Sequence, residues 1–578
     1  MKVFSTLLTL TSILGALAAP APVVDDSHLD ERALTITVSA PAGTIVGKRG
    51  LLTDDFNGIP YAAPPISNLR LRPPQRISSP LNNFDATKAA AACPQFLADS
   101  DDSGLLAQVM STVSRTALFQ RALKISEDCL SVNVIRPRGT KAGDNLPVLF
   151  WIYGGGFELG WSSMYDGGGL VQNAALNGKP YVFVAVNYRV GAWGFMPGKE
   201  ILADGAGNLG LLDQRMGLEW VADNIAAFGG DPSRVTIWGE SAGAISVWNQ
   251  MTAYGGNIEY KGKPLFRGAI MNSGSIIPAD PVDCPKGQAI YDAVVEKAGC
   301  SGPDSLACLR QLPLDQFTEA ANSVPAILSY TSVALSYLPR PDGSFMPESP
   351  QQLLLKGRYA AVPMIIGDQE DEGTLFSLFQ ANTTETTPMI VRYLKDLFFN
   401  GASEATLTAL VETYEDVPAE GSPFRTGPLN EVYKGFKRLA AILGDLVFTI
   451  TRRIFLDIAK TVNPSVPAWS YIASYNYGTP ILGTFHGSDL LQVFFGILPN
   501  KASRDIQAYY SNFVYNLDPN NYSGGTNRLS RVIDNWPQWE RGTKKLIQFY
   551  AHHFQPMIDD FRTDSEQILS SNFESFHI

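Results

Sequence analysis

The stretch Val235–Ser246, which reads VTIWGESAGAIS, constrains the fold of this chain more than any other. Its first four residues are β-branched or aromatic and predict a short buried strand, and the residues after Gly243 have helical character. Gly239 and Gly243 flank Ser241 in a G-x-S-x-G pattern. A strand that turns so abruptly into a helix leaves no room for a Cβ atom at either glycine. The pattern therefore predicts a strained turn that exposes the Ser241 hydroxyl at the top of a sheet, which makes Ser241 a candidate nucleophile.

Further apolar runs predict the sheet to which this strand belongs. They recur between helical or turn-rich segments, and several are continuously apolar rather than alternating. Strands covered by helices on both faces have this pattern. The predicted fold class is therefore α/β, with a large and mostly parallel central sheet flanked by helices. The predicted strands are Pro147–Tyr153, Tyr181–Asn187, Val235–Trp238, Ala269–Asn272, Val362–Ile366 and Ala468–Tyr475.

Composition excludes several classes of protein. Apolar residues make up 45% of the chain and charged residues 17%, which favours a large globular core over disorder. The formal net charge of −11, without clusters of lysine and arginine, argues against a nucleic-acid partner. After residue 18, no stretch approaches the ~18 uninterrupted apolar residues of a spanning helix, so we expect no transmembrane segment.

The N-terminus predicts secretion. Residues 1–18 combine an early lysine, an apolar run and an Ala-Leu-Ala ending, as in a cleaved signal peptide. Residues 19–32 are polar and contain proline, and we expect a pro-segment trimmed after Arg32. No repeat or long linker divides the rest of the chain, so residues 33–578 are predicted to form one catalytic domain.

Residues 103–117 predict an amphipathic helix between Cys93 and Cys129. An apolar residue recurs every fourth position, polar residues lie on the other side, and Ser103 can cap the start. One interpretation is a surface helix packed on the body of the protein. The other is a lid that covers the active site and exposes its apolar face to lipid when it opens. The apolar positions are Leu105, Val109, Val113 and Ala117.

A serine hydroxyl needs a base to become an effective nucleophile, and imidazole is the usual base near neutral pH. In the expected order of such sites the base follows the serine, which excludes His28. His577 is expected to be mobile near the end of the chain, and His552 and His553 lie in QFYAHHFQPM, which predicts a terminal helix. His486 instead lies in the glycine-bounded loop GTFHGSD after a predicted strand, where α/β folds place working residues. His486 is therefore the candidate base.

The acid of the site should lie between Ser241 and His486 in the sequence and should follow another strand. Val362–Ile366 is such a strand, and the sequence DQEDEGT comes soon after it. A run of acids of this kind is also typical of a solvated loop. Spacing does not decide among the four candidates, Asp368, Glu370, Asp371 and Glu372.

An oxyanion hole needs backbone N–H groups that are free to meet a developing negative charge. The predicted strand that ends at Tyr153 leads into three glycines, Gly154–Gly156, followed by Phe157. Glycine runs also occur in flexible loops, but here the run follows a strand and precedes the Ser241 turn. The glycine amides, with that of Ala242, are the candidate donors.

Five cysteines in a secreted chain predict two disulfides and one free thiol. The pairs nearest in sequence are Cys93 with Cys129 and Cys300 with Cys308, although the sequence alone allows other pairings. The only N-x-S/T sequons begin at Asn382 and Asn521, so both asparagines are candidate glycosylation sites.

With these features the chain resembles the type-B carboxylesterase/lipase family of the α/β-hydrolase fold. FGGDPSRVTIWGESAGAIS (Phe228–Ser246) is similar to the serine signature of that family, and EDCLSVNVIRP (Glu127–Pro137) to its second signature. NGIPYAAPP, NYRVGAWGF, DEGT and GTFH also match, so the resemblance extends from about residue 35 to the end. WIYGGGFELG, the long 93–129 flap and GTFHGSDL are most similar to secreted fungal lipases and sterol esterases of the Candida rugosa lipase type.

The resemblance implies a role for several residues. The triad would be Ser241, Glu372 and His486, and the oxyanion hole would be formed by Gly155, Gly156 and Ala242. The flap would be a lid over an apolar tunnel for the acyl chain. We expect Phe157, Leu375 and Phe376 in its wall, the disulfides Cys93–Cys129 and Cys300–Cys308, and Cys284 as an additional cysteine. Glu240 either adds negative potential near His486 or is a buried structural partner.

These features predict a secreted serine hydrolase that cleaves carboxylic esters of lipids, including acylglycerols and sterol esters, through an acyl-enzyme. No metal or organic cofactor is expected, and the partners would be the ester and a lipid–water interface, with the chain a monomer or a weak homodimer. One alternative is a carboxylesterase for short soluble esters. Another is a catalytically silent binding protein on the same fold, which the presence of nucleophile, acid, base and hole disfavours.

Overall fold

The structure is a computed structural model that describes residues 34–96, 124–494, 500–520 and 535–578. The predicted signal peptide, the pro-segment, the helix at 103–117 and the sequon at Asn521 lie outside these ranges. No helix in the described ranges is long and apolar enough to cross a membrane.

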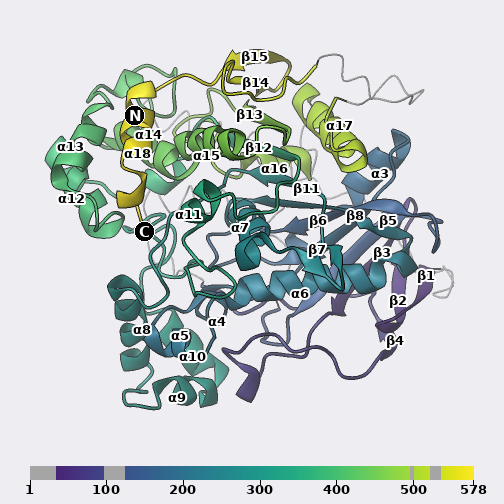
Figure 1. The fold of residues 1–578 in the computed structure, drawn as a ribbon. Coiled ribbons are helices and arrows are strands. Elements are labelled where there is room, and N and C mark those ends of the chain that lie inside the picture. Colours follow the sequence, from purple (N-terminus) through teal and green to yellow (C-terminus); the bar gives the residue numbers. More distant parts are fainter. Residues whose placement is uncertain (1–33, 97–123, 495–499, 521–534) are drawn as a thin grey trace, which may run out of the picture.

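One sheet of 13 strands organises the described part of the chain (Figure 1). Its central strands are all parallel to their neighbours, in the order β7, β6, β8, β11, β12, β13 and β14. This mixed, mostly parallel sheet confirms the predicted fold class, and each of the six predicted strands is present. The bounds are β6 Leu146–Ile152, β7 Val182–Val186, β8 Gly230–Glu240, β11 Gly268–Asn272, β12 Met364–Gln369, β13 Ala468–Ser474 and β14 Lys545–Tyr550.

The strands at the two edges of the sheet pair mainly in the antiparallel direction. One margin is a ribbon of β1, β2, β3 and β5, in which β5 pairs with β7, and β4 pairs in parallel with β2. The other margin is β15, which pairs with β14. The bounds are β1 Thr35–Ala40, β2 Gly43–Arg49, β3 Thr53–Pro60, β4 Leu81–Asp85, β5 Ser131–Pro137 and β15 Phe554–Ile558.

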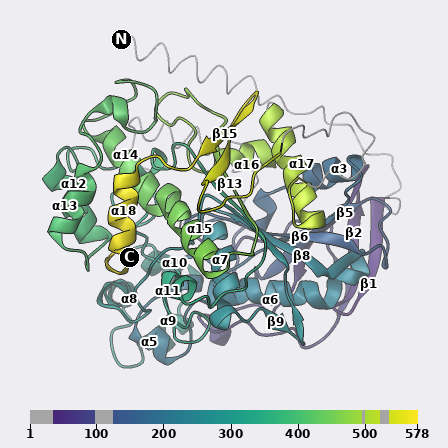
Figure 2. The same ribbon diagram turned by 45° about the horizontal axis from the view of Figure 1, so that its top comes forward.

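Helices cover both faces of the sheet (Figures 1 and 2). Helices α6 (Leu209–Asn224) and α7 (Ala242–Gly256) pack on one face, and α3 (Gly168–Leu176) and α17 (Lys501–Asn516) on the other. The central strands are therefore buried on both sides, and every residue of β7 is buried. Removal of this apolar surface from water is the main force that holds the layers together.

Helical segments inserted after the central strands form two further groups, which Figure 1 shows beside the sheet. One group follows β11 and the other follows β12. The first contains α8 Pro285–Lys297, α9 Ser305–Gln311 and α10 Leu314–Ala321, with α11 Pro350–Leu355 packed on α7. The second contains α12 Thr387–Leu397, α13 Glu404–Glu412, α14 Phe436–Gly444 and α15 Ile450–Val462, and α18 Thr563–Ser571 packs on α13, whereas α16 Ser488–Val493 packs on α17.

Two predictions about the C-terminal region are wrong. The segment QFYAHHFQPM is not helical, because β14 and β15 form a hairpin whose turn contains His552 and His553. Pairing of β14 with β13 decides this structure, and a local helical pattern cannot reveal it. His577 is held in place, since its Nδ1 lies 3.1 Å from Asp280 Oδ1.

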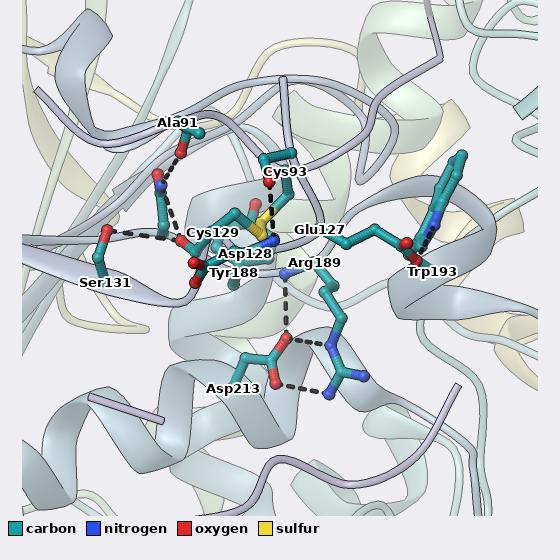
Figure 3. Close-up of a disulfide and its surroundings, with 12 residues drawn as sticks. Ala91, Cys93, Glu127, Asp128, Cys129, Ser131, Tyr188, Arg189, Trp193 and Asp213 are labelled. Carbon is teal, nitrogen blue, oxygen red and sulfur yellow. Dashed lines mark hydrogen bonds and ion pairs between the residues drawn. A yellow bond between two sulfur atoms is a disulfide. The ribbon is translucent and has the colours of Figure 1, made fainter. Parts of the chain in front are cut away.

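The structure contains the disulfides Cys93–Cys129 and Cys300–Cys308, and Cys284 is a buried free cysteine. Figure 3 shows the first disulfide near the ion pair of Arg189 with Asp213, a residue of α6. Beside this disulfide, backbone hydrogen bonds join Ala92 N to Lys124 O (2.8 Å) and Ser126 N to Ala92 O (3.0 Å). The two ends of the segment with the predicted lid helix are therefore fastened together.

Candidate active site

Ser241 lies at the junction of β8 and α7 with φ 57° and ψ −126°. Such a conformation is sparsely populated by non-glycine residues and costs about 1–3 kcal/mol. A Cβ atom on Gly239 would lie 2.3 Å from the Gly243 carbonyl carbon, and one on Gly243 would lie 2.1 Å from Ile152 O. The predicted crowding is confirmed, and both glycines are needed for the turn that presents Ser241.

Three segments distant in sequence meet at this turn. His486, in the loop after β13, has Nε2 2.8 Å from Ser241 Oγ. Its Nδ1 lies 2.6 Å from Oε2 of Glu372, which follows β12. Glu372 is itself held by the backbone N–H of Gln369, which donates to Oε1 over 2.7 Å. Serine, imidazole and carboxylate thus form a continuous line of hydrogen bonds at the carboxyl ends of parallel strands.

The geometry separates the four acids that spacing left open. Only Glu372 among them hydrogen-bonds His486. Asp368 pairs with Arg452 at 2.8 Å, and Glu370 pairs with Arg425 at the surface. Asp371 accepts hydrogen bonds from backbone and hydroxyl donors.

Asp371 links the loop that carries Glu372 to the loop that carries His486 through hydrogen bonds. No sequence pattern indicates this role. Its Oδ2 accepts from Thr484 N at 2.9 Å, and its own N–H donates to Thr484 O at 3.0 Å. Its Oδ1 accepts from Ser422 Oγ at 2.9 Å and from Phe424 N at 2.8 Å. Because Asp371 precedes Glu372 and Thr484 lies close to His486, these bonds set the relative position of acid and base.

Carboxylates surround His486. Glu240 Oε1 lies 3.4 Å from His486 Nε2. Burial raises the pKa of Glu240 to about 8 and that of Asp489 to about 6. Burial alone would lower the pKa of His486, but the charges of Glu372 and Glu240 outweigh it and raise that pKa. The site therefore stabilises an imidazolium.

Gly155 and Gly156 follow β6 with φ values of 109° and 61°, which favour glycine. Their amides donate no hydrogen bond to another residue within the described ranges. Ala242 is the first residue of α7, so its amide has no partner inside the helix. Backbone donors beside Ser241 are the requirement of an oxyanion hole.

An apolar pocket opens beside Ser241. Phe157 and Phe376 line it, whereas Leu375 is buried but is not part of the lining, contrary to expectation. The segments after β11 and β12 supply most of the wall. The lining residues are Gly156, Phe157, Ser241, Ala242, Ile245, Asn249, Ile277, Ile327, Val333, Leu335, Leu338, Pro339, Pro350, Phe376, Val447, Phe448 and Ile578.

Among the residues that the structure describes, no group of three histidine, cysteine, aspartate or glutamate side chains is arranged to hold a metal ion. The strand order of the sheet and the hydrogen-bonded Ser241, His486 and Glu372 at the carboxyl ends of its strands define the class of protein. It is a serine hydrolase with the α/β-hydrolase fold. The Carboxylesterase family model matches residues 34–567, and the chain belongs to this family. It is a carboxylic ester hydrolase.

Relatives and solved structures agree with this assignment. The chain is 58% identical to a secreted triacylglycerol lipase of Gibberella zeae, covering 94% of this chain and 91% of that protein. It is 56% identical to a secreted lipase of Botryotinia fuckeliana, covering 96% of each, and 43% identical to Lipase 4 of Diutina rugosa, covering 93% and 96%. The crystal structure of Aspergillus niger EstA matches with a TM-score of 0.77 and 26% identity, covering 95% of this chain and 100% of that one.

Proposed function

We propose that the protein is a secreted lipase in which Ser241 is the nucleophile, His486 the general base and Glu372 the acid that orients it. The observation that carries the proposal is the unbroken line from Ser241 Oγ through both ring nitrogens of His486 to Glu372 Oε2. That arrangement lets the imidazole take a proton from the hydroxyl while the carboxylate stabilises the resulting cation.

The reaction proceeds in two halves. Ser241 Oγ attacks the ester carbonyl carbon as its proton moves to His486 Nε2, and the amides of Gly155, Gly156 and Ala242 receive the oxyanion. The C–O bond to the alcohol then breaks, and Nε2 returns the proton to the leaving oxygen. Water repeats the sequence on the acyl-enzyme, which releases the acid and restores Ser241.

Two observations favour lipid esters as substrates. The pocket beside Ser241 is lined almost entirely by apolar side chains, as a long acyl chain requires. Two of the most similar relatives carry names that state secretion and lipase activity. We assign the chain to the extracellular space, as a monomer or a weak homodimer that meets a lipid–water interface through the 93–129 flap.

The test is the rate of hydrolysis of one sparingly soluble ester as its concentration passes the solubility limit. We expect the rate to jump when droplets appear, with Ser241→Ala as the control that shows no hydrolysis. Saturation below the limit without a jump would favour a carboxylesterase for short soluble esters. A parent rate no higher than that of Ser241→Ala would refute the proposed nucleophile.

A further inference from the structure

One polar side chain lies in the wall of the otherwise mainly apolar pocket. Asn249 of α7 lines the pocket and is only 1% exposed. Its Nδ2 and Oδ1 have no hydrogen-bond partner among the described residues. Buried polar groups are nearly always paired, because an unpaired amide loses its hydration without compensation. The pocket therefore holds a donor and an acceptor that the fold itself does not use.

Two neighbours on α7 share part of this property, since Trp248 Nε1 and Gln250 Oε1 also lack a hydrogen-bond partner among the described residues, but in Asn249 both polar atoms of the side chain do. Gln250 is also buried, but its Nε2 donates to Leu211 O at 2.9 Å and to Gln214 Oε1 at 3.2 Å. Gln250 thereby joins α7 to α6 and has a structural role. Asn249 lies on the side of the helix that faces the pocket and has no such bond.

The place of Asn249 relative to the reacting group follows from helix geometry. Ser241 is the N-cap residue of α7, and Ile245 and Asn249 follow on the helix, four residues apart and on one side of it; all three line the pocket. Eight residues of helix span about 12 Å, so Asn249 meets an acyl chain well away from the ester carbonyl. Most of the other lining residues of the pocket are apolar, and they include Ile277, Pro350 and Ile578.

We propose that Asn249 is a specificity determinant that hydrogen-bonds an oxygen carried partway along the acyl chain, so that the pocket prefers hydroxylated over unsubstituted long acyl groups. A hydroxyl both donates and accepts, and the amide offers one atom of each kind. An unsubstituted chain of equal length leaves both amide atoms unpaired, and this discriminates against it. The inference rests on the proposed lipase function, because it assigns the acyl chain to this pocket.

The experiment compares two esters of one alcohol, ricinoleoyl and oleoyl, whose acyl groups differ by a single mid-chain hydroxyl. Both are offered together to the whole enzyme, so that the product ratio gives the ratio of kcat/KM. We expect the parent to prefer the ricinoleoyl ester by about tenfold, the effect of one well-formed hydrogen bond to a buried group. Asn249→Leu, which keeps the size and removes both polar atoms, should bring the ratio near unity, mainly by raising the oleoyl rate.

A matched control changes the apolar wall instead. Ile277→Leu alters the shape of the same pocket and should shift both rates alike, so that the ratio stays with the parent. A parent ratio near unity, or an unchanged ratio in a folded Asn249→Leu, would overturn the inference while oleoyl hydrolysis still supports the lipase. Hydrolysis of neither ester would instead refute the proposed function. The parent's ratio needs no variant, so failure of Asn249→Leu to fold leaves the inference testable.

Discussion

Two clusters of buried charge lie near β12 and differ in how their charges are balanced. In one, Arg452 and Arg453 of α15 hold Asp559 at 2.8 and 2.9 Å, and Arg452 also reaches Asp368. Burial alone would raise the pKa of Asp559, but the two guanidinium groups outweigh it and lower that pKa. In the other cluster, Glu240, Glu372 and Asp489 act on His486, and burial raises the pKa of Glu240.

This difference in charge balance indicates that the Arg452 cluster has a structural role and the His486 cluster a catalytic one. The Arg452 cluster is balanced in its resting state by Asp559 and Glu566, which pair with the two guanidinium groups, while burial raises the pKa of Asp368 to about 8. These ion pairs hold α15 against the sheet and the Asp559 segment. The His486 cluster has an excess of carboxylates, and its net negative charge falls when the imidazole takes up a proton, which is the step that the proposed mechanism requires. Substitutions should therefore affect stability in the first cluster and the rate in the second.

The largest effect is expected from Glu372→Gln. The amide keeps the shape of the side chain but cannot stabilise an imidazolium, and the comparable change in a serine protease lowers kcat by about 10⁴-fold. The measurement is kcat for a soluble ester, with the melting temperature as a check on folding. Glu370→Gln is the matched control, because this acid lies in the same loop and pairs with Arg425 at the surface. Equal losses in both variants would contradict the assigned roles.

Next in size is Arg452→Leu in the balanced cluster. Asp559 would keep its buried charge with less compensation, which should destabilise the fold by about 3–5 kcal/mol. We expect a lower melting temperature and an unchanged kcat for the folded fraction. Arg541→Leu breaks an exposed pair with Asp457 and should leave the melting temperature nearly unchanged. A loss of kcat without a loss of stability in Arg452→Leu would remove the distinction between the clusters.

Asp371→Ala tests the tether, that is, whether the hydrogen bonds of Asp371 hold the Glu372 loop and the His486 loop in position. Loss of the bonds to Thr484 and Phe424 should let acid and base separate, and a displacement of about 1 Å can reduce a rate about 10²-fold. We expect kcat to fall and KM to change little, since Asp371 is not part of the pocket lining. A rise in KM alone, measured on the same ester, would argue against this positioning role.

The smallest effect is expected from Glu240→Gln, measured as the pH dependence of kcat/KM. His486 must be neutral to accept the proton of Ser241, so the rate falls below the pKa of His486. Above about pH 8, where Glu240 loses its proton, its charge is one cause that raises this pKa. Without it the acid limb should move to lower pH, by about one unit or less, equivalent to about 1 kcal/mol. A limb that stays in place would show that Glu240 carries no charge in the working enzyme.

The same variant has a linked effect on stability. The pKa of Glu240 in the folded protein is about 8 instead of 4.5, so the folded state keeps a proton that the unfolded chain has lost between these values. The stability that Glu240 contributes is therefore full below about pH 4.5 and is lost as the pH rises towards 8. Thermal melts across this range should show the parent losing stability relative to Glu240→Gln.

The sequence by itself determined the features that depend on local sterics and local apolar patterns. The G-x-S-x-G turn, its two glycines and the six strands are predictable from the residues alone, because a tight turn or a buried strand restricts the residues within it. The likeness of the DEGT element to a known family, and not spacing, selected Glu372. The helix predicted around His552 is wrong, since pairing with β13 decided the structure of that segment.

Only the tertiary structure decided which groups meet. Ser241 and His486 are separated by 245 residues and Glu372 and His486 by 114, so no local pattern contains their contact. The tether at Asp371 and the place of Leu375 outside the pocket also depend on long-range packing. Asn249 shows the physical reason most clearly. In the sequence it is one polar residue of a helix, and only the packed core shows that it lines an apolar pocket while its amide has no partner among the described residues.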